Sequence, residues 1–130
     1  MIVLDASAAV DWLLQTPAGA QIGRRILARG ESLHAPHLID LEIVQALRRL
    51  TTDGTITARR ADESIQDLRA LRINRYPHFV FLPWIWLHRN NFSAYDACYV
   101  ALAEKLGATL ITRDGRLASA ARHAAKIELF

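Results

Sequence analysis

Four acidic residues stand where folding could bring them together. Asp5 and Asp114 each follow a short apolar run, Asp96 opens an apolar stretch, and Glu42 lies in a helical pattern. Carboxylates gathered in one pocket raise one another's pKa unless a cation joins them. Oxygen ligands of this kind select Mg²⁺ or Mn²⁺ over zinc. An ion held in this way suits phosphodiester cleavage, because it helps to deprotonate the attacking water and neutralises charge on the leaving oxygen.

Two of these acids follow predicted strands. Short β-branched runs alternate with helical stretches along the chain, which predicts an α/β fold with a mostly parallel sheet. Strands are expected at residues 2–5 and 108–112, and the carboxyl ends of parallel strands share one edge, where ligands bind. Asp5 and Asp114 are then neighbours although they lie 109 positions apart in the sequence. The ordinary alternative is that each is a loop or cap residue at a strand-to-helix turn.

Asp96 has two interpretations that the sequence leaves open. It stands three residues after Ser93, which is the spacing of a capping box. The predicted helix over 94–106, which ends at Gly107, is apolar on every side and is therefore expected to be buried. An acid at the entrance of a buried helix needs a positive partner or loses its charge. A bound cation would serve, and helix capping alone would also explain the residue.

Glu42 competes with Asp40 for a place in the predicted site. Both lie in a helix expected from Pro36 to Thr52, at opposite margins of its apolar stripe. Periodicity does not choose between them, and an acid at such a margin is usually a solvated rim residue.

The other elements follow from caps and helix breakers. A Thr-Pro pair opens a helix at residue 16, and a threonine caps another at residue 57. Residues 79–89 are expected to be helical, with a late start or a kink at Pro83. Further helices are expected over 7–14 and 115–122. Strands are expected over 31–35, 73–76 and, at an edge of the sheet, 126–129.

Composition bounds the class of protein. The chain has 130 residues, of which 52% are hydrophobic and 22% charged, so residues 1–130 are expected to form a single domain with its own core. The longest uncharged run, residues 76–88, is too short to span a membrane. No signal peptide is evident, and a single cysteine excludes an internal disulfide and a cysteine metal cluster. A reducing cytoplasm is the expected compartment.

The charge balance is informative only through its distribution. Sixteen basic and thirteen acidic residues give +3. If four acids occupy one site, nine acids against sixteen bases remain, or +7, and the rest of the surface attracts a polyanion. Arg113 and Arg116, which flank Asp114, are predicted to contact the phosphates of such a polyanion. A solvated surface with a slight excess of arginine is the simpler interpretation.

The order of these motifs resembles a known family. The motifs in question are Asp5-Ala6-Ser7, Pro36 to Glu42, Ser93-Ala94-Tyr95-Asp96-Ala97 and Thr112-Arg113-Asp114. They resemble the motifs of PIN-domain ribonucleases. Two further stretches, 75–78 and 95–104, resemble more narrowly the VapC toxins of bacterial type II toxin–antitoxin pairs, especially mycobacterial ones. The resemblance covers essentially the whole chain.

The resemblance implies a function and a site. It implies a three-layer PIN fold whose mostly parallel central sheet has four or five strands, and Mg²⁺- or Mn²⁺-dependent endonucleolytic cleavage of RNA that leaves a 5′-phosphate. It selects Glu42 over Asp40, and it makes Ser7 and Thr112 the hydroxyls that orient carboxylates or waters. The implied catalytic and metal-binding residues are Asp5, Glu42, Asp96 and Asp114.

The resemblance also implies partners. These are a cognate VapB-like antitoxin that blocks the site, a transfer or ribosomal RNA substrate, and a second copy of the chain, so that a homodimer can enter a toxin–antitoxin hetero-oligomer. The apolar stretch 79–87 suits a dimer interface or an antitoxin groove. Gln45 stands where the family often has Asn, and Trp84 where related toxins often carry a basic residue.

Two other functions compete with a toxin nuclease. One is a catalytically weak PIN-like module that binds RNA or its antitoxin without cutting, for which Gln45 is the only hint. The other is a phosphatase of the aspartyl-phosphate type. That chemistry needs a second acid two positions after Asp5, where Ser7 stands instead.

Overall fold

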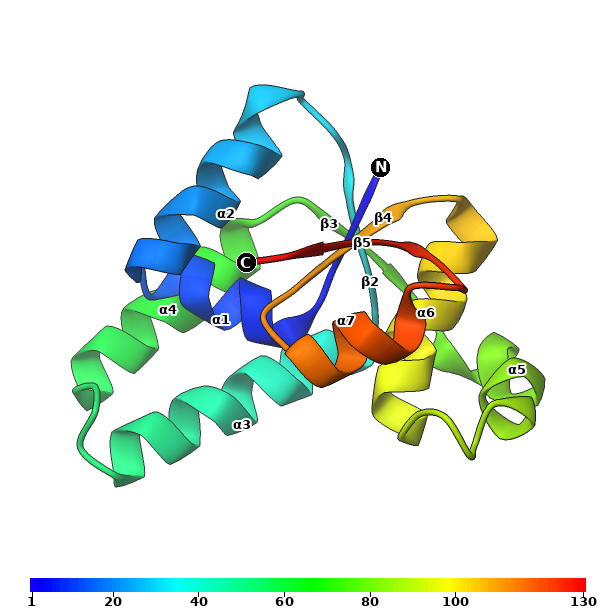
Figure 1. Cartoon of the computed structure of the whole chain (residues 1–130). Coiled ribbons are helices and arrows are strands. Elements are labelled where there is room, and N and C mark those ends of the chain that lie inside the picture. Colours follow the sequence, from blue (N-terminus) through cyan, green and yellow to red (C-terminus); the bar gives the residue numbers. More distant parts are fainter.

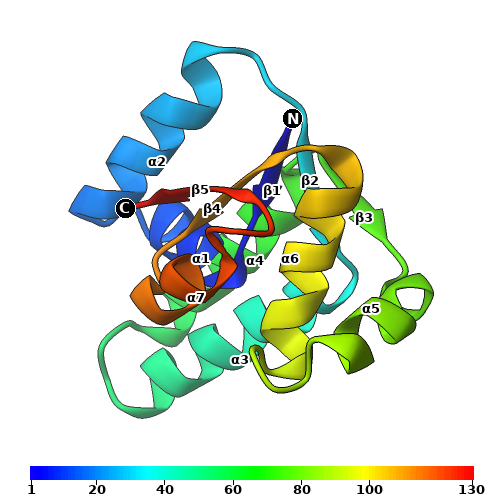
Figure 2. The ribbon, with the colours of Figure 1, turned by 45° about the vertical axis from the view of Figure 1, so that its right-hand side comes forward.

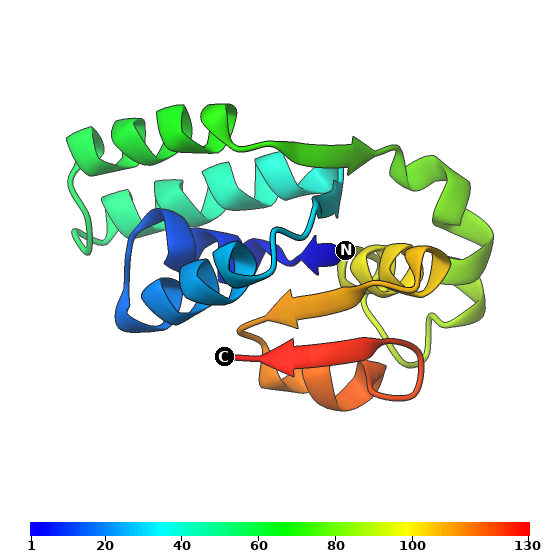
Figure 3. The same cartoon turned by 90° about the horizontal axis from the view of Figure 1, so that it is seen from above.

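The computed structural model describes all 130 residues and places five strands in one sheet. The strand order is β3-β2-β1-β4-β5, and every neighbouring pair is parallel. Figure 3 shows this order from β3 in green to β5 in red. The prediction of an α/β fold with a mostly parallel sheet is confirmed. The strands are β1 (Ile2–Leu4), β2 (Leu33–Pro36), β3 (Ile73–Tyr76), β4 (Thr109–Thr112) and β5 (Lys126–Leu129).

Every connection between consecutive strands contains at least one helix. In Figure 1 the helices α1 to α4 lie to the left of the strands, and α5 and α6 lie to the right. No helix combines the length and the apolar character that crossing a bilayer requires. The helices are α1 (Ala6–Leu13), α2 (Pro17–Ala28), α3 (Leu38–Thr52), α4 (Ala58–Ala70), α5 (Leu82–Leu87), α6 (Ala94–Leu106) and α7 (Gly115–Ala121), with a 3₁₀ turn η1 (His78–Phe81) before α5.

Several helix boundaries lie where the sequence signals predict them. Thr16, Thr57 and Ser93 each accept a backbone N–H three residues on, which satisfies a donor that the helix leaves unpaired. Gly107 ends α6 with φ of 59°, a left-handed conformation that glycine adopts without steric cost. The predicted ranges of α6, β3 and β5 are confirmed residue for residue.

Other boundaries differ for physical reasons. Ser7 does not cap α1: Asp5 is the N-cap residue, and the serine hydroxyl is used inside the site described below. Pro36 ends β2 opposite Tyr76 instead of opening α3. The stretch 79–89 is divided into η1 and α5, with Pro83 in the first turn of α5, where a helix needs no N–H.

Part of the hydrophobic core lies between the sheet and α6, and buried residues of α1, α2 and α3 belong to the same core. Residues 97–103 of α6 are all buried, as its apolar pattern predicts, and this helix packs against β1, β2 and β4. All three residues of the central strand β1 are fully buried. Because β1 is fixed in the core, the next residue, Asp5, has a fixed position at the edge of the sheet.

Candidate functional site

The candidate site lies where β1 and β4 end beside each other. Leu4 is opposite Ile111 in the parallel register, so both strands end at the same edge of the sheet. Asp5 comes directly after β1, and Asp114 comes two residues after β4. Figures 1 and 2 show that α1, α3, α6 and α7 all begin on this lower side of the sheet. Acids from both ends of the sequence thereby meet at one edge.

Asp5 is buried and is held by two hydroxyl groups. Ser7 Oγ donates to its Oδ2 atom at 2.5 Å, and Thr112 Oγ1 donates to the same atom at 2.7 Å. Each hydroxyl accepts a backbone N–H from the turn after β4, Ser7 from Arg113 and Thr112 from Asp114, both at 3.0 Å. Because these N–H groups use the hydroxyl oxygens as acceptors, the hydroxyl hydrogens are free to point at Asp5. The network fixes the carboxylate in one orientation.

Asp114 caps α7 and still keeps an oxygen free. Its Oδ1 atom accepts the N–H groups of Arg116 at 2.8 Å and Leu117 at 3.1 Å. Its Oδ2 atom has no hydrogen-bond partner within the chain. The capping role and a ligand role are therefore compatible in this side chain.

Asp40 and Glu42 have different partners in the structure. Arg75 binds both oxygens of Asp40, at 2.7 Å through Nε and 2.8 Å through Nη2, so that acid is neutralised. Glu42 has no basic partner, and its Oε2 atom accepts one hydrogen bond, from Tyr99 at 3.0 Å. Asp40 is thus paired and Glu42 lacks a counter-charge, and the role of Glu42 in the site stays a prediction.

Asp96 stands in the helix cap that one of its two interpretations predicted, and its role as a cation ligand stays a prediction. Ser93 Oγ accepts the Asp96 N–H at 3.1 Å, so the N-terminal cap of α6 is present. The side chain of Asp96 is partly buried and forms no ion pair. Capping satisfies the backbone and leaves the charge of the carboxylate without a counter-charge.

The four acids act on one another electrostatically. Burial raises the pKa of Asp5, and the charge of Asp114 raises it further, against the lowering effect of the two hydroxyls. Burial, with the charges of Asp5 and Asp96, raises the pKa of Glu42 to about 7 although the Tyr99 hydroxyl lowers it. Burial and the charges of Asp5 and Asp114 raise the pKa of Asp96. Each shift reflects the cost of negative charge that has no positive partner.

This donor set fits a hard divalent cation in its chemistry. All four side chains offer carboxylate oxygens, which Mg²⁺ and Mn²⁺ prefer, and every ion pair of the chain involves other acids. No three His, Cys, Asp or Glu side chains, however, form a group at metal-binding spacing as they stand. The acids meet as repelling charges and not as a closed ligand shell, so their metal-binding roles stay a prediction.

A cleft leads away from the acids between α1 and α3. Its volume is about 720 Å³, and Ser7, Glu42 and Tyr95 line it together with apolar side chains such as Leu41. Gln45, the departure from the family pattern, also lines this cleft and is exposed. The cleft is large enough for a nucleotide-sized group next to Glu42.

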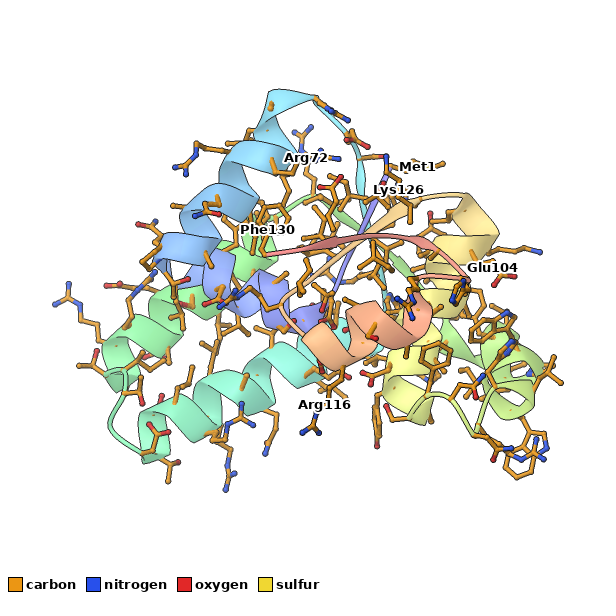
Figure 4. All side chains as sticks on the ribbon, viewed as in Figure 1. Met1, Arg72, Glu104, Arg116, Lys126 and Phe130 are labelled. Carbon is orange, nitrogen blue, oxygen red and sulfur yellow. The ribbon has the colours of Figure 1, made fainter.

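The two arginines predicted to contact RNA differ in their surroundings. The guanidinium of Arg113 binds Asp11 at 2.7 Å through Nε and also donates to the backbone carbonyl of Phe130. Arg116 is exposed and forms no ion pair, and Figure 4 shows its side chain extending below the start of α7. Arg116 is therefore the freer of the two cations beside Asp114.

Sequence reasoning missed two residues that shape the site. Arg75 was noted only as part of a motif, yet it removes Asp40 from consideration. Tyr99 was placed in the apolar core, yet its hydroxyl reaches Glu42. The only signal in the sequence was a lone hydroxyl within the apolar run of residues 97–103.

The raised pKa of Glu42 predicts how stability depends on pH. An acid whose folded-state pKa is raised stabilises the fold when protonated, and this contribution is lost as the pH rises from 4.5, its ordinary value, through about 7. We therefore expect the metal-free chain to lose stability relative to its Glu42→Gln variant over this pH range. Urea unfolding of both proteins in EDTA at several pH values measures the difference.

Two features of this experiment isolate Glu42. Burial lowers the pKa of His34, so this histidine makes stability rise with pH in the same range. Its effect is common to both proteins and cancels in the comparison. Adding Mg²⁺ at a pH above 7 should restore the lost stability of the parent more than that of the variant. Parallel stability curves for the two proteins would contradict the assignment of Glu42 to the acidic cluster.

Comparison with known proteins identifies the class to which this fold and site belong. Residues 2–123 match the family described as PIN domain. The chain belongs to this family, whose VapC nucleases generally depend on a divalent metal ion.

Several mycobacterial VapC ribonucleases are among its relatives. The chain is 43% identical to Ribonuclease VapC12 of Mycobacterium tuberculosis over 129 residues, covering 99% of this chain and 98% of the relative. It is 45% identical to VapC ribonuclease Mb0985 of Mycobacterium bovis over 117 residues, covering 90% and 88%. The resemblance to mycobacterial VapC toxins is confirmed.

Solved structures support the same fold. VapC20 of Mycobacterium tuberculosis, described as a sarcin-ricin loop cleaving toxin, superimposes with a TM-score of 0.65 at 20% identity, covering 92% of this chain and 95% of that chain. FitAcB from Neisseria gonorrhoeae gives a TM-score of 0.63 at 18% identity, covering 98% and 96%. At these identities the likeness concerns the fold alone.

Proposed function

We propose that this chain is a metal-dependent endoribonuclease that acts as the toxin of a type II toxin–antitoxin pair. The observation that carries the proposal is the gathering of four carboxylates without a basic partner at the carboxyl edge of the sheet. These residues are Asp5, Glu42, Asp96 and Asp114. Family membership and the ribonuclease relatives point to the same activity.

The proposed reaction is hydrolysis of an RNA phosphodiester bond without a covalent intermediate. Water attacks phosphorus, the bond to the 3′ oxygen breaks, and the products carry a 5′-phosphate and a 3′-hydroxyl. Mg²⁺ or Mn²⁺, when bound, lowers the pKa of water and neutralises charge on the leaving oxygen. Asp5 and Asp114 would hold the principal ion, and Glu42 and Asp96 would complete the site or hold a second one. Ser7 and Thr112 keep the Asp5 carboxylate in place.

Metal removal tests this proposal. A fluorescent transfer or ribosomal RNA should be cut when Mg²⁺ or Mn²⁺ is present and remain intact in EDTA, with cutting restored by excess metal. A binding module, for which Gln45 is the only hint, would bind the RNA without producing fragments at any metal concentration. That outcome would contradict the nuclease proposal and favour the catalytically weak binding module.

Arg116 is proposed to contact an RNA phosphate near the cut. The Arg116→Ala variant should cut more slowly, and its cleavage rate should depend less on salt, because one phosphate contact is lost. Arg113→Ala is the matched comparison, because its guanidinium is engaged by Asp11 and Phe130. An Arg116→Ala variant with the parent's rate and salt dependence would contradict the contact.

A protein partner is proposed for the η1–α5 patch, defined as the exposed apolar side chains of η1 and α5. A cluster of this kind is unusual on a small monomer, and it supports the expected homodimer and the VapB-like antitoxin. We place the complex in the cytoplasm, where its RNA substrates are. The patch consists of Phe79, Val80, Leu82, Trp86 and Leu87.

A further inference from the structure

Tyr99 carries the one hydroxyl in the buried run of α6. Residues 97–103 are all buried, and Tyr99 itself is only 1% exposed. The rest of this run is alanine, cysteine, valine and leucine. A buried hydroxyl is costly unless it is hydrogen-bonded, so its partner in the fold is informative.

The partner of this hydroxyl is a carboxylate of the proposed site. Tyr99 donates to Glu42 Oε2 at 3.0 Å, across the gap between α6 and α3. This is the only hydrogen bond that the Glu42 side chain forms, and no basic side chain pairs with it. Glu42 also lines the cleft between α1 and α3 and is partly buried there.

We propose that Tyr99 is a positioning residue, which holds Glu42 so that its Oε1 atom is presented to a divalent cation. The proposal rests on the proposed function, because it assumes that Glu42 helps to bind the metal ion. The hydrogen bond fixes one carboxylate oxygen and the side-chain torsions of the glutamate. Partners of metal ligands orient those ligands in this way.

The ring and the hydroxyl of Tyr99 have separate roles. The ring fills core volume, and phenylalanine would fill it equally. The hydroxyl adds nothing to apolar packing, and its only partner is Glu42. The Tyr99→Phe variant therefore removes the positioning contact while it preserves the core.

Binding of Mn²⁺ alone, followed by electron paramagnetic resonance in the absence of RNA, tests the proposal. We expect Tyr99→Phe to bind Mn²⁺ about tenfold more weakly than the parent. Its RNA cleavage should fall at limiting Mn²⁺ and recover at excess. Tyr76→Phe is the matched control, since it also removes a tyrosine hydroxyl, one hydrogen-bonded to His34 at 2.8 Å outside the acidic site.

A double-mutant cycle separates positioning from a structural effect. In a Glu42→Ala background, Tyr99→Phe should weaken Mn²⁺ binding no further, because the group through which Tyr99 acts is gone. Equal losses in both backgrounds, unchanged Mn²⁺ binding in Tyr99→Phe, or an equal loss in Tyr76→Phe would each overturn the proposal. A parent that binds Mn²⁺ but does not cut RNA would instead refute the proposed function, and the cycle would still decide the role of Tyr99.

Discussion

Asp5→Asn is expected to abolish RNA cleavage while it makes the chain more resistant to unfolding. Asparagine has the same shape, and its amide oxygen can accept the hydroxyls of Ser7 and Thr112. Burial raises the pKa of the Asp5 carboxyl, which means that its negative charge destabilises the fold. The substitution removes this charge, so the metal-free fold gains stability near pH 7. Under the proposed function Asp5 is a metal ligand, and its loss should lower the cleavage rate on the order of 10³-fold, the scale of removing a group that acts on the transition state.

Cleavage of RNA in vitro, growth after induction and thermal unfolding together measure this prediction. The variant should no longer arrest growth, and mapping of RNA ends in induced cells should show the parent's cuts to be absent. Asp53→Asn is the matched control: this aspartate is exposed at the end of α3, and hydrogen bonds from Thr55 lower its pKa. That control should cut normally and lose, not gain, stability. An Asp5→Asn variant that cuts at the parent's rate would remove Asp5 from the site.

Gly19→Ala is expected to cause the largest loss of stability from adding a single methyl group. A Cβ atom on Gly19 would lie 1.9 Å from the backbone oxygen of Asp11, where α2 crosses α1. Backbone cannot rotate aside as a side chain can, so the helices must separate. We expect a loss of about 3 kcal/mol, or roughly 10 °C in the melting temperature, measured by thermal unfolding.

Gly23→Ala tests whether contact with backbone is the cause. Its Cβ would meet Nε1 of the Trp12 ring at 2.8 Å, on the same helix pair. A side chain can rotate away, so this variant should lose clearly less stability than Gly19→Ala. Equal losses in both variants would show that crowding between α1 and α2 in general, and not the Asp11 carbonyl, limits the packing.

Local signals in the sequence predicted much of the fold. The helix Ala94–Leu106 was predicted to the residue, because a serine cap, an unbroken apolar run and a glycine stop all act within the segment itself. The division of the segment around Pro83 into η1 and α5 was not predicted, because a proline is compatible with a late helix start as well as with a kink. Pro36 ends a strand instead of opening a helix because its register opposite Tyr76 depends on a strand forty residues away.

The acids of the site were predictable as candidates, but their pairing was not. The helical wheel of α3 places Asp40 and Glu42 at equivalent margins of its apolar stripe. In the structure the two acids differ because Arg75, which β3 contributes, pairs with Asp40. Arg113 is predicted to contact RNA phosphates because it stands beside Asp114, and no sequence pattern indicates that Asp11 and Phe130 bind its guanidinium from other elements. Such contacts join residues far apart in sequence, so no local pattern reports them.

The pairing of β1 with β4 bears on when this molecule can harm the cell that makes it. The strand Ile2–Leu4 lies in register with residues more than a hundred positions later. Asp5 cannot reach Thr112 or Asp114 until ribosomes have delivered that distant segment, and closing so long a loop is slow. Under the proposed function, a nascent chain that lacks β4 has no assembled site, and it becomes able to cut RNA only after β4 has folded beside β1.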